Sequence, residues 1–535
     1  MTPPPRTLVL NCTRFGDLLQ TQPLASGLAM QGRQVGILCL ETFQDAARLL
    51  RDVTFVAAVP GARILATLDR SWPKALADTW TFRQDISAAF PPDDVLNLTA
   101  TVPSRLLSRF LSLSRTPPAP ERGFCLDAWG FSRTIHPWAS FLLASTRRRG
   151  CSPFNLVDSF WKAADLPDMP RPNHLLPPSA EAMQAIAPLF DAFPSPGGYV
   201  GLQLGASEER RRWPIREFAA MAALLWQRHG LTPVVLGSPA EVPLAQRFVE
   251  AYHALVPAGP VIVAAGKTSL TELAAVLTRL VLLVTNDTGT MHLAAGLGVD
   301  IASIFLATAQ PWDTGPYRPG SLSLEPDLPC HPCAYGSVCP REHQCRHVIA
   351  GDMLAEAIGR FLPARTWTRA ETGREFAGAR AWLSRVDLAE GGFMTLESLS
   401  GHEETDRTRW IRLQRRMYRR FLDNLPLDPA AAPVSLSPAA AAAVQAEIQT
   451  ALALLTLLDG QLQALVQTSL PPIKRKFLAT WERLQASWEG SAYFNVLGYM
   501  FANTGQEQGD DLRAVARMLA AYKTLLAAWR LHLPD

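Results

Sequence analysis

Short apolar segments alternate with helical patterns from the start of the chain to residue 305. The alternation begins with residues 7–12 and 35–40, and it begins again at residues 199–204 after the linker 193–198, which is rich in Pro and Gly. Strands that alternate with helices form parallel α/β sheets. Two successive units of this kind imply a cleft between them, and ligands of α/β proteins usually bind in such clefts.

The pattern becomes mainly helical after residue 350. Residues 381–399 predict a hairpin that turns at Gly391-Gly392, because paired glycines favour a tight turn between two strands. Helices are expected beyond it at residues 407–422, 438–458, 461–487 and 511–533. We therefore expect two Rossmann-like α/β domains, at residues 1–190 and 195–360, followed by a mainly helical C-terminal extension at residues 380–535.

Charge and hydropathy exclude two classes of protein. The 535 residues carry 51 Lys and Arg against 48 Asp and Glu, which leaves a net charge of only +3. This near-balance, with no long basic run, argues against a protein that binds nucleic acid through bulk charge. The sequence has no signal-peptide core and no uninterrupted apolar run of membrane-spanning length, so we expect a cytoplasmic protein.

Three loop motifs stand at the ends of expected strands and carry candidate chemistry. The first is Arg14-Phe15-Gly16-Asp17, in which an acidic residue follows a strand and begins a helix. One interpretation is that the negative charge of Asp17 stabilises the N-terminus of that helix and has no other role. Alternatively, it is a carboxylate at a turn that faces the cleft, where it can take up a proton.

The second motif, residues 205–214, combines small residues, Ser207 and three arginines with a helix start at Trp213-Pro214. The fixed φ of Pro214 suits the first position of that helix. Backbone N–H groups and guanidinium groups in such a loop suit a diphosphate. A solvated basic loop would have the same composition.

The third motif, residues 286–292, follows the most apolar strand of the chain. Gly289 lets the backbone approach a ligand closely, and the helix that starts at Thr290 points its N-terminus at the cleft. His292 lies on the first turn of this helix, where it fits either a ligand site or a satisfied core histidine.

Taken together, the motifs resemble glycosyltransferase family 9, the bacterial heptosyltransferases, over residues 5–360. The resemblance implies the GT-B fold, in which two Rossmann-like domains face a cleft, here with an added mainly α-helical C-terminal domain. It rests on four stretches in family order: Arg14-x-Gly16-Asp17-x-x-x-Thr21-x-Pro23, Ser207-x-x-x-Arg211-x-Trp213-Pro214, Leu236-Gly237-Ser238-Pro239-Ala240-Glu241 and Asn286-Asp287-Thr288-Gly289-x-x-His292.

The resemblance also implies a role for individual residues. Asp17 would be the general base for the acceptor hydroxyl, and Glu241 would bind the nucleotide ribose. Arg211 stands where the family often has Lys, which keeps the charge but changes the geometry of phosphate binding. Transfer would invert the anomeric centre in one displacement, and the chemistry would need no cofactor. The residues that would hold the donor diphosphate and sugar are Ser207, Arg211, Asp287, Thr288, Gly289 and His292.

The implied donor is ADP-heptose, and we expect the acceptor to be the inner core of lipopolysaccharide. Arginines at 105, 109, 115 and 147–149 give the N-terminal half basic patches that suit an anionic acceptor, although a solvated face explains them nearly as well. One alternative is a hydroxyl of a protein, as in relatives that heptosylate autotransporter proteins. Another is a non-catalytic protein that binds a nucleotide sugar. No nucleic-acid partner is expected.

Four of the eight cysteines are crowded together at Cys330-x2-Cys333-x5-Cys339-x5-Cys345. Grouped thiolates in a cytoplasmic protein bind Zn or Fe tetrahedrally, so we expect a structural metal ion here. The alternative is a loop of reduced thiols or a redox-labile pair of cysteines. Similar cysteine-rich segments occur in the relatives that heptosylate autotransporter proteins, where the resemblance suggests bound iron. The remaining cysteines are expected to be buried small hydrophobic residues: Cys12, Cys39, Cys125 and Cys151.

The C-terminal helices lie outside the family resemblance. They could join two copies of the chain, dock on a partner at the membrane or pack across the cleft. We expect peripheral contact with the inner membrane through a basic or amphipathic surface, and a homo-oligomer formed through these helices.

Overall fold

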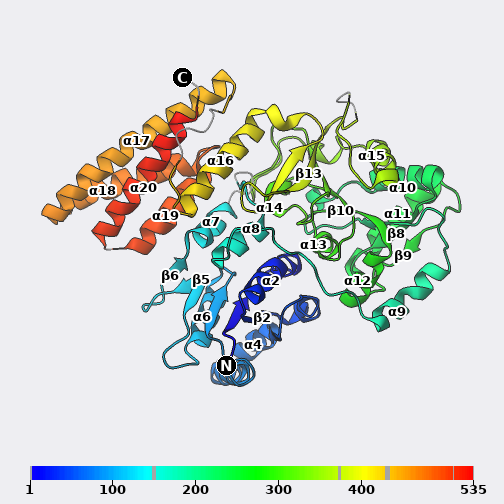
Figure 1. Ribbon diagram of the computed structural model, residues 1–535, viewed down its shortest axis with the longest axis horizontal. Helices are drawn as coiled ribbons and strands as arrows, with labels where there is room; N and C mark the ends of the chain where they lie inside the picture. Colours follow the sequence, from blue (N-terminus) through cyan, green and yellow to red (C-terminus); the bar gives the residue numbers. More distant parts are fainter. Residues whose placement is uncertain (1–2, 147–151, 372–374, 428–433, 510, 534–535) are drawn as a thin grey trace.

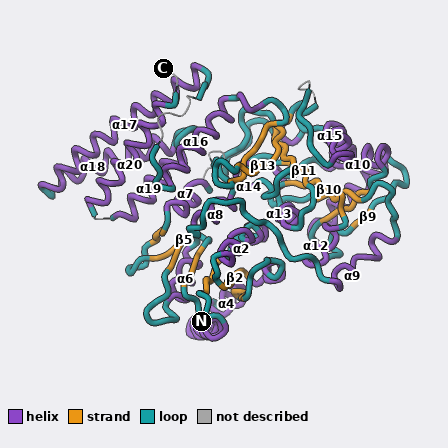
Figure 2. Tube along the Cα trace, in the orientation of Figure 1, coloured by secondary structure: helices purple, strands orange, loops and turns teal. Residues whose placement is uncertain are grey.

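The computed structural model describes residues 3–146, 152–371, 375–427, 434–509 and 511–533. Two β-sheets with their covering helices form the body of the molecule, and a bundle of helices projects from one side of it (Figure 1). Figure 2 shows that the strands belong to the body and that the projecting part is helical.

The first sheet is Rossmann-like. Its strand order is β3-β2-β1-β4-β5-β6, in which the first five strands are parallel and β6 is antiparallel to β5. The strands are β1 (Arg6–Leu10), β2 (Gln34–Leu40), β3 (Phe55–Val59), β4 (Asp94–Asn97), β5 (Glu121–Leu126) and β6 (Ser132–Ile135). The helices of this part are α1 (Phe15–Leu19), α2 (Gln22–Met30), α3 (Gln44–Ala47), α4 (Gly61–Leu68), α5 (Trp72–Ala89), α6 (Val102–Ser112), α7 (Pro137–Ser145) and α8 (Leu156–Ala163).

The second sheet repeats this topology and extends it. Its order is β14-β13-β12-β11-β10-β7-β8-β9, so that β7 to β12 follow the doubly wound order of a dinucleotide-binding sheet. The strands are β7 (Tyr199–Gln203), β8 (Thr232–Leu236), β9 (Ile262–Val263), β10 (Leu280–Asn286), β11 (Ile301–Ile304), β12 (Leu322–Pro326), β13 (Ala379–Asp387) and β14 (Phe393–Ser398). The helices are α9 (Ala180–Asp191), α10 (Ile215–His229), α11 (Val242–Leu255), α12 (Leu270–Thr278), α13 (Gly289–Gly296), α14 (Pro311–Thr314) and α15 (Gly351–Ala364).

Local signals account for several of these boundaries. Ser269 and Glu272 form a capping box at the start of α12. Pro214 is the N-cap of α10 and not its first helical residue, because its extended backbone places the helix start at Ile215. The hairpin expected at residues 381–399 exists as β13 and β14, but it belongs to the second sheet, since β13 pairs antiparallel with β12.

The helical bundle consists of five helices. They are α16 (Asp406–Leu422), α17 (Pro438–Gln467), α18 (Pro471–Glu489), α19 (Asn495–Gln508) and α20 (Leu512–Leu531). The break that the sequence suggested near Gly460 is wrong: α17 continues to Gln467 and the chain turns before Pro471-Pro472. Pro471 cannot donate a backbone hydrogen bond, so it starts a helix readily and does not continue one.

Helix α17 is the one described helix that is long and apolar enough to cross a membrane by length and composition alone. It packs on α18 and α20 in the bundle. Val444, Leu455 and Leu458 on its inner face are completely buried. This is the arrangement of an amphipathic bundle helix, which buries one apolar face against its neighbours.

Helix α16 ties the bundle to β12 of the second sheet and to the loop after α8 through arginine side chains. Arg407 Nη1 lies 2.6 Å from Glu325 Oε1 on β12, and Arg419 Nη2 donates to Asp168 Oδ2 at 2.6 Å. Glu325 is completely buried. Burial alone would raise the pKa of Glu325, but Arg407, His331 and Arg380 more than offset it and hold that pKa well below its usual range.

Candidate functional site

A cavity of about 640 Å³ lies between the two sheets, and we call it the cleft cavity. It opens at the ends of β1, β7 and β10, as expected for the carboxyl edge of doubly wound sheets. Every residue that the sequence assigned to donor binding or proton transfer lines it: Asp17, Ser207, Arg211, Glu241, Asp287, Thr288, Gly289 and His292. Their roles remain predictions, but the fold brings four distant segments together.

Asp17 is held by the polar residue that ends β1. Asn11 is buried, and its Nδ2 donates to the carbonyl oxygen of Asp17 at 3.0 Å and to Thr21 Oγ1 at 2.8 Å. Asn11 Oδ1 accepts from Thr13 Oγ1 at 2.5 Å. The sequence motifs do not include Asn11, whereas in the structure it fixes the loop that carries the carboxylate.

The two halves of the cleft touch at a pair of glycines. A Cβ atom on Gly16 would lie 2.8 Å from His292 Cδ2 and 3.3 Å from Gly289 Cα. A Cβ atom on Gly289 would collide with the ring of Phe15. Helix α1 therefore packs directly on α13 because both contact positions lack a side chain, and this contact sets how closely Asp17 faces the second sheet.

Arg211 is the central charge of the cavity. It is 5% exposed, its Nη1 donates to Ser207 Oγ at 2.9 Å, and its Nη2 forms an ion pair with Asp287. Within the described residues, Arg211 Nε is buried and has no hydrogen-bond partner. A buried guanidinium donor without a partner is costly, and a phosphate oxygen would satisfy it.

Asn286 joins the loops on which these groups stand. Its Nδ2 donates to the carbonyl oxygens of Leu204 at 2.9 Å and Gly205 at 3.2 Å, and its Oδ1 accepts from the backbone N–H of Trp213 at 2.9 Å. The loops after β7 and β10 are thereby locked together. The motif contained Asn286, but only the fold shows that it is the connecting residue.

Glu241 and the start of α13 complete the cavity wall. Glu241 Oε2 accepts from Ser238 N at 2.7 Å and Ser238 Oγ at 2.9 Å in a capping box, and Glu241 Oε1 packs against Gly205. Thr288 is the N-cap of α13 and forms no side-chain capping bond. The first N–H groups of α13 therefore face the cavity in the manner of an anion site.

A second cavity, of about 340 Å³, adjoins the first, and we call it the side cavity. Arg14, Asp17 and Thr314 line both cavities. Asp17 thus stands at the boundary between them. Its half-buried carboxylate can be reached from the second sheet on one side and from α7 and α8 on the other.

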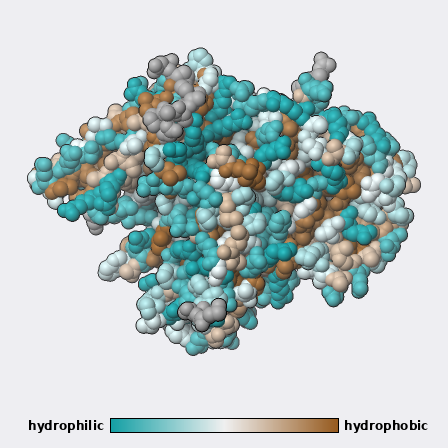
Figure 3. Space-filling model, in the orientation of Figure 1, coloured by the Kyte–Doolittle hydropathy of each residue, from teal (hydrophilic) through white to brown (hydrophobic). Residues whose placement is uncertain are grey.

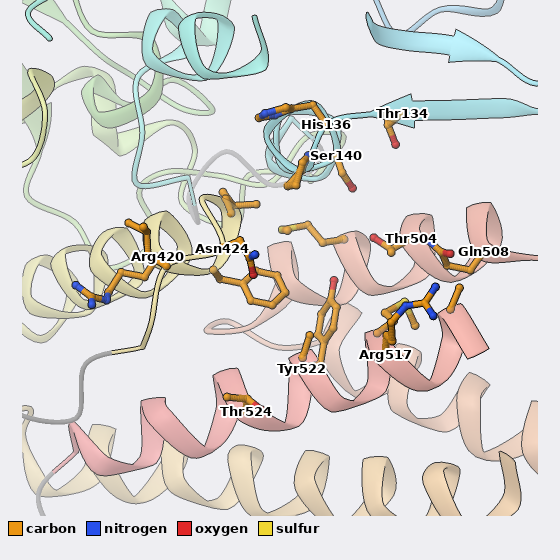
Figure 4. Close-up of a pocket in the computed structure, with 18 of the residues that line it drawn as sticks. Thr134, His136, Ser140, Arg420, Asn424, Thr504, Gln508, Arg517, Tyr522 and Thr524 are labelled. Carbon is orange, nitrogen blue, oxygen red and sulfur yellow. The ribbon is translucent and has the colours of Figure 1, made fainter. Parts of the chain in front are cut away.

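A larger cavity of about 840 Å³ lies elsewhere, between the first sheet and the helical bundle. Figure 4 shows its wall, with His136 and Ser140 at α7, Asn424 beyond α16, and Tyr522 on α20. Its described lining contains no residue of the three motifs. The charged groups that suit a nucleotide are in the cleft cavity, so size alone does not identify the site.

The cysteine-rich segment does not form the expected metal site. Among the described residues, no group of three or more His, Cys, Asp or Glu side chains is arranged to hold a metal ion. Instead, Cys339 Sγ accepts from the backbone N–H of His343 at 3.3 Å, and Cys333 Sγ lies 3.8 Å from the carbonyl oxygen of Cys330. Cys345 is buried. The four side chains as positioned do not fit a tetrahedral ion, and the metal stays a prediction.

The scattered cysteines behave as the sequence suggested where the structure describes them. Cys39 and Cys125 are buried and Cys12 is half-buried. Burial raises the pKa of Cys39 to about 11 and those of Cys12 and Cys125 to about 12, so the thiols are protonated and unreactive. Cys151 lies outside the described residues.

The basic patches expected to meet an anionic acceptor are engaged elsewhere. Arg105 is buried, and its Nη1 donates to the carbonyl oxygens of Cys125 at 2.9 Å and Arg133 at 2.7 Å. Arg109 and Arg115 form ion pairs with Glu121 and Asp93. Arg105 therefore supports the first sheet from inside, whereas Arg109 and Arg115 form partly exposed ion pairs at its surface. Residues 147–149 lie outside the described part of the chain.

Comparison with known proteins agrees with this geometry. Residues 158–340 match the family model described as glycosyltransferase family 9 (heptosyltransferase). The chain contains a glycosyltransferase family 9 domain. The match includes the motifs at residues 207–214, 236–241 and 286–292 and does not reach residues 14–23. The resemblance to the family is confirmed over that stretch, the protein is a glycosyltransferase, and its two Rossmann-like sheets around a cleft form the expected GT-B fold. No curated protein sequence matches the chain significantly.

Solved structures of heptosyltransferases are similar to this chain at low identity. The ADP-heptose lipopolysaccharide heptosyltransferase II of E. coli shares 17% identity over 67% of this chain and 98% of its own, with a TM-score of 0.48. The E. coli heptosyltransferase WaaC with ADP shares 22% over 58% and 91%, with a TM-score of 0.42. The iron-containing dodecameric glycosyltransferase TibC of enterotoxigenic E. coli shares 12% over 68% and 78%, with a TM-score of 0.38.

Proposed function

We propose that this glycosyltransferase transfers a heptose from ADP-heptose to an acceptor hydroxyl in the cleft cavity. One observation carries the proposal: Asp17 faces the cleft cavity from the first sheet, while buried Arg211 and the N-terminus of α13 face it from the second. A base and an anion cradle on opposite walls are the two parts that an inverting transfer needs. The division into an acceptor half at residues 1–190 and a donor half at residues 195–360 belongs to this proposal.

The proposed chemistry is a single displacement. The acceptor oxygen attacks the anomeric carbon of the heptose, and Asp17 takes up the proton of the hydroxyl. The new carbon–oxygen bond forms as the bond to the diphosphate breaks, and ADP leaves with the electron pair. Arg211, Ser207 and the α13 N-terminus stabilise the charge that develops on the diphosphate. Attack opposite the leaving group inverts the anomeric centre.

Two classes of acceptor are compatible with this reaction. The inner core of lipopolysaccharide is the first, and a protein hydroxyl is the alternative. Buried hydrogen bonds take Arg105 out of the basic patch that favoured an anionic core sugar, whereas Arg109 and Arg115 form partly exposed ion pairs with Glu121 and Asp93.

We also propose that the protein is cytoplasmic and touches the inner membrane through the turn between α17 and α18. Val466 and Leu470 at this turn are exposed, and Lys474, Arg475 and Lys476 follow on the exposed start of α18. Apolar side chains beside three cations suit an anionic bilayer. The turn lies at the left end of the molecule in Figure 1, and Figure 3 shows hydrophobic side chains among hydrophilic ones on this part of the bundle. The alternative partner for this surface is a second copy of the chain.

The transfer proposal is tested by Asp17→Asn with ADP-heptose as donor. The variant should bind ADP-heptose with near-normal affinity, because Asp17 is not placed against the diphosphate, and should release ADP at less than a hundredth of the normal rate. Asp69→Asn, on the exposed surface of the first sheet domain, is the matched control. Normal ADP release by Asp17→Asn would refute the assignment of Asp17 as the base.

A further inference from the structure

The cavity of about 840 Å³ between the first sheet and the helical bundle is large enough to hold a ligand, and we call it the bundle cavity. Helix α7 forms one wall, and α19 and α20 of the bundle form the facing wall (Figure 4). The end of α16 and the residues that follow it close one end. Its described lining contains none of the residues assigned to the transfer reaction.

The bundle cavity contains a buried hydroxyl, that of Ser140 on α7. Ser140 is 7% exposed, and its Oγ forms no hydrogen bond to any residue that the structure describes. A serine inside a helix can bond a carbonyl oxygen of the preceding turn, as Ser145 on the same helix does with Leu142 at 3.1 Å. The Ser140 side chain instead points from α7 toward the bundle (Figure 4). A buried hydroxyl without a partner costs free energy, and a polar group of a ligand in the cavity would satisfy it.

Apolar side chains from three helices lie around this hydroxyl. Met500 on α19 and Met518 on α20 are buried, and Phe421 on α16 is half-buried. Leu425, which follows α16, is 45% exposed and leaves apolar surface for a ligand to cover. Methionine side chains adapt to the shape of what they contact. An alkyl or aromatic group would therefore gain free energy by burial against these residues.

Most other polar side chains of the lining are hydrogen-bonded within the protein. Glu507 on α19 accepts from the backbone N–H of Thr134 at 2.6 Å and also from its hydroxyl. The further bonds join Trp138 N to His136 Nδ1, Tyr522 to Thr504, Arg420 Nε to the Pro426 carbonyl oxygen, and Thr524 Oγ1 to the Ala520 carbonyl oxygen. Besides Ser140, the polar lining side chains without a hydrogen bond or salt bridge among the described residues are Asn424, Gln508 and Arg517. Ser140 is the buried one of these four.

The charges of the lining do not favour an ion. At the turn between α19 and α20, Glu507 and Arg517 carry opposite signs, so a ligand of either charge would meet a like charge there. At the other end, the guanidinium of Arg420 is turned away from the other labelled side chains (Figure 4). Burial lowers the pKa of His136, so its imidazole is neutral at pH 7. An uncharged ligand therefore fits the cavity better than an ion.

We propose that the bundle cavity binds an uncharged amphiphile, a molecule with an alkyl or aromatic body and one hydroxyl or amide group that bonds Ser140. The body lies against the methionines of α19 and α20 and against Leu425. The site is independent of the proposed transfer, because it needs neither Asp17 nor a donor in the cleft cavity. It gives the helical bundle, which lies outside the family match, a ligand-binding role.

Displacement of the neutral apolar dye N-phenyl-1-naphthylamine tests the proposal on the full-length protein. The dye should bind with a rise in fluorescence, and 1-decanol should displace it with an affinity at least about tenfold higher than that of 1-hexanol, because four further methylene groups are buried. Decanoate and decylammonium should bind at least about tenfold more weakly than 1-decanol at neutral pH. Absence of dye binding, or binding of either ion as tight as that of 1-decanol, would overturn the proposal.

A matched pair of variants on α20 locates the binding. Ala521 is an exposed residue of the cavity lining, so Ala521→Phe fills the cavity without altering the core and should weaken dye and 1-decanol binding at least about tenfold. Ala520, its exposed neighbour, lies outside the lining, and Ala520→Phe should leave both affinities within about twofold. Equal affinities in the two variants would place the ligand elsewhere and refute the site.

A second pair of variants, on α7, tests the hydrogen bond. Ser140→Ala should weaken 1-decanol binding about threefold or more, because the alcohol loses its partner. Ser145→Ala, at a serine of the same helix that bonds Leu142 and lines the side cavity, should change it less than about twofold. If Ser140→Ala binds 1-decanol as tightly as the normal protein does, the hydroxyl is not the partner of the ligand and the proposed recognition is wrong.

Discussion

Removing the Arg211 side chain should weaken donor binding strongly. The guanidinium is 5% exposed, already bonds Ser207 and pairs with Asp287, and keeps a buried Nε donor without a partner among the described residues. A hydrogen bond from a charged donor to a phosphate is worth about 1.5–3 kcal/mol. Arg211→Met should therefore lower ADP affinity by about 3 kcal/mol, or roughly a hundredfold, in calorimetric titration.

A matched pair of variants separates this effect from general loss of positive charge. Arg216→Met removes an exposed arginine from α10 that pairs with Glu217 and lies outside the lining of the cleft cavity. It should change ADP affinity less than threefold. In Arg211→Met the Asp287 carboxylate loses its partner, so adding Asp287→Asn should recover part of the lost affinity. If Arg211→Met binds ADP within threefold of the normal protein, the anion cradle has been assigned to the wrong group.

The remaining predictions concern the cleft contact and the buried ion cluster. Gly16→Ala should separate α1 from α13 and lower the rate of ADP-heptose turnover at least about tenfold, a larger loss than in ADP affinity, because a Cβ there meets His292; turnover equal to that of the normal protein would show that this contact does not position Asp17. Arg407→Met should lower the free energy of unfolding in urea by about 3 kcal/mol, because Glu325 keeps a buried charge with fewer partners; a loss below 1 kcal/mol in urea would contradict that estimate. Since the folded pKa of Glu325 is depressed, its contribution is present above the unfolded value near 4.5 and is lost as the pH falls below it. Stability should therefore decline less steeply below pH 4.5 in Glu325→Gln than in the normal protein, and identical pH slopes would exclude this origin. Lys474→Glu combined with Lys476→Glu should abolish sedimentation with phosphatidylglycerol vesicles and leave the oligomeric state unchanged; loss of an oligomer would assign the surface to a second copy.

Sequence periodicity predicted the two α/β units because each strand and helix carries its own local signal. Pairing between distant strands has no such signal, and the hairpin β13–β14 could not be assigned to the second sheet before β12 was seen beside it. Helix α19 was missed for a related reason. It contains Gly498 and Gly505, which lower helix propensity, but these glycines lie against Trp488 and Trp481 of α18. Packing, and not propensity, stabilises that helix.

The candidate site could likewise be predicted only in part from the sequence. The motifs identified residues that line the cleft cavity, because loops at strand ends carry recognisable sequence patterns. The groups that position them, Asn11 and Asn286, act through contacts that only the fold creates. Arg105 was expected to face an anion, but in the folded sheet it is buried and donates to the carbonyl oxygens of Cys125 and Arg133.

The central claim, an ADP-sugar donor in the cleft cavity, is tested most directly by calorimetric titration of ADP, UDP and GDP and of ADP-heptose into the purified protein. The account predicts that ADP and ADP-heptose bind at least about tenfold more tightly than UDP or GDP, and that Arg211→Met loses this binding while Arg216→Met keeps it. Tighter binding of UDP or GDP, or no binding of any nucleotide, would contradict it.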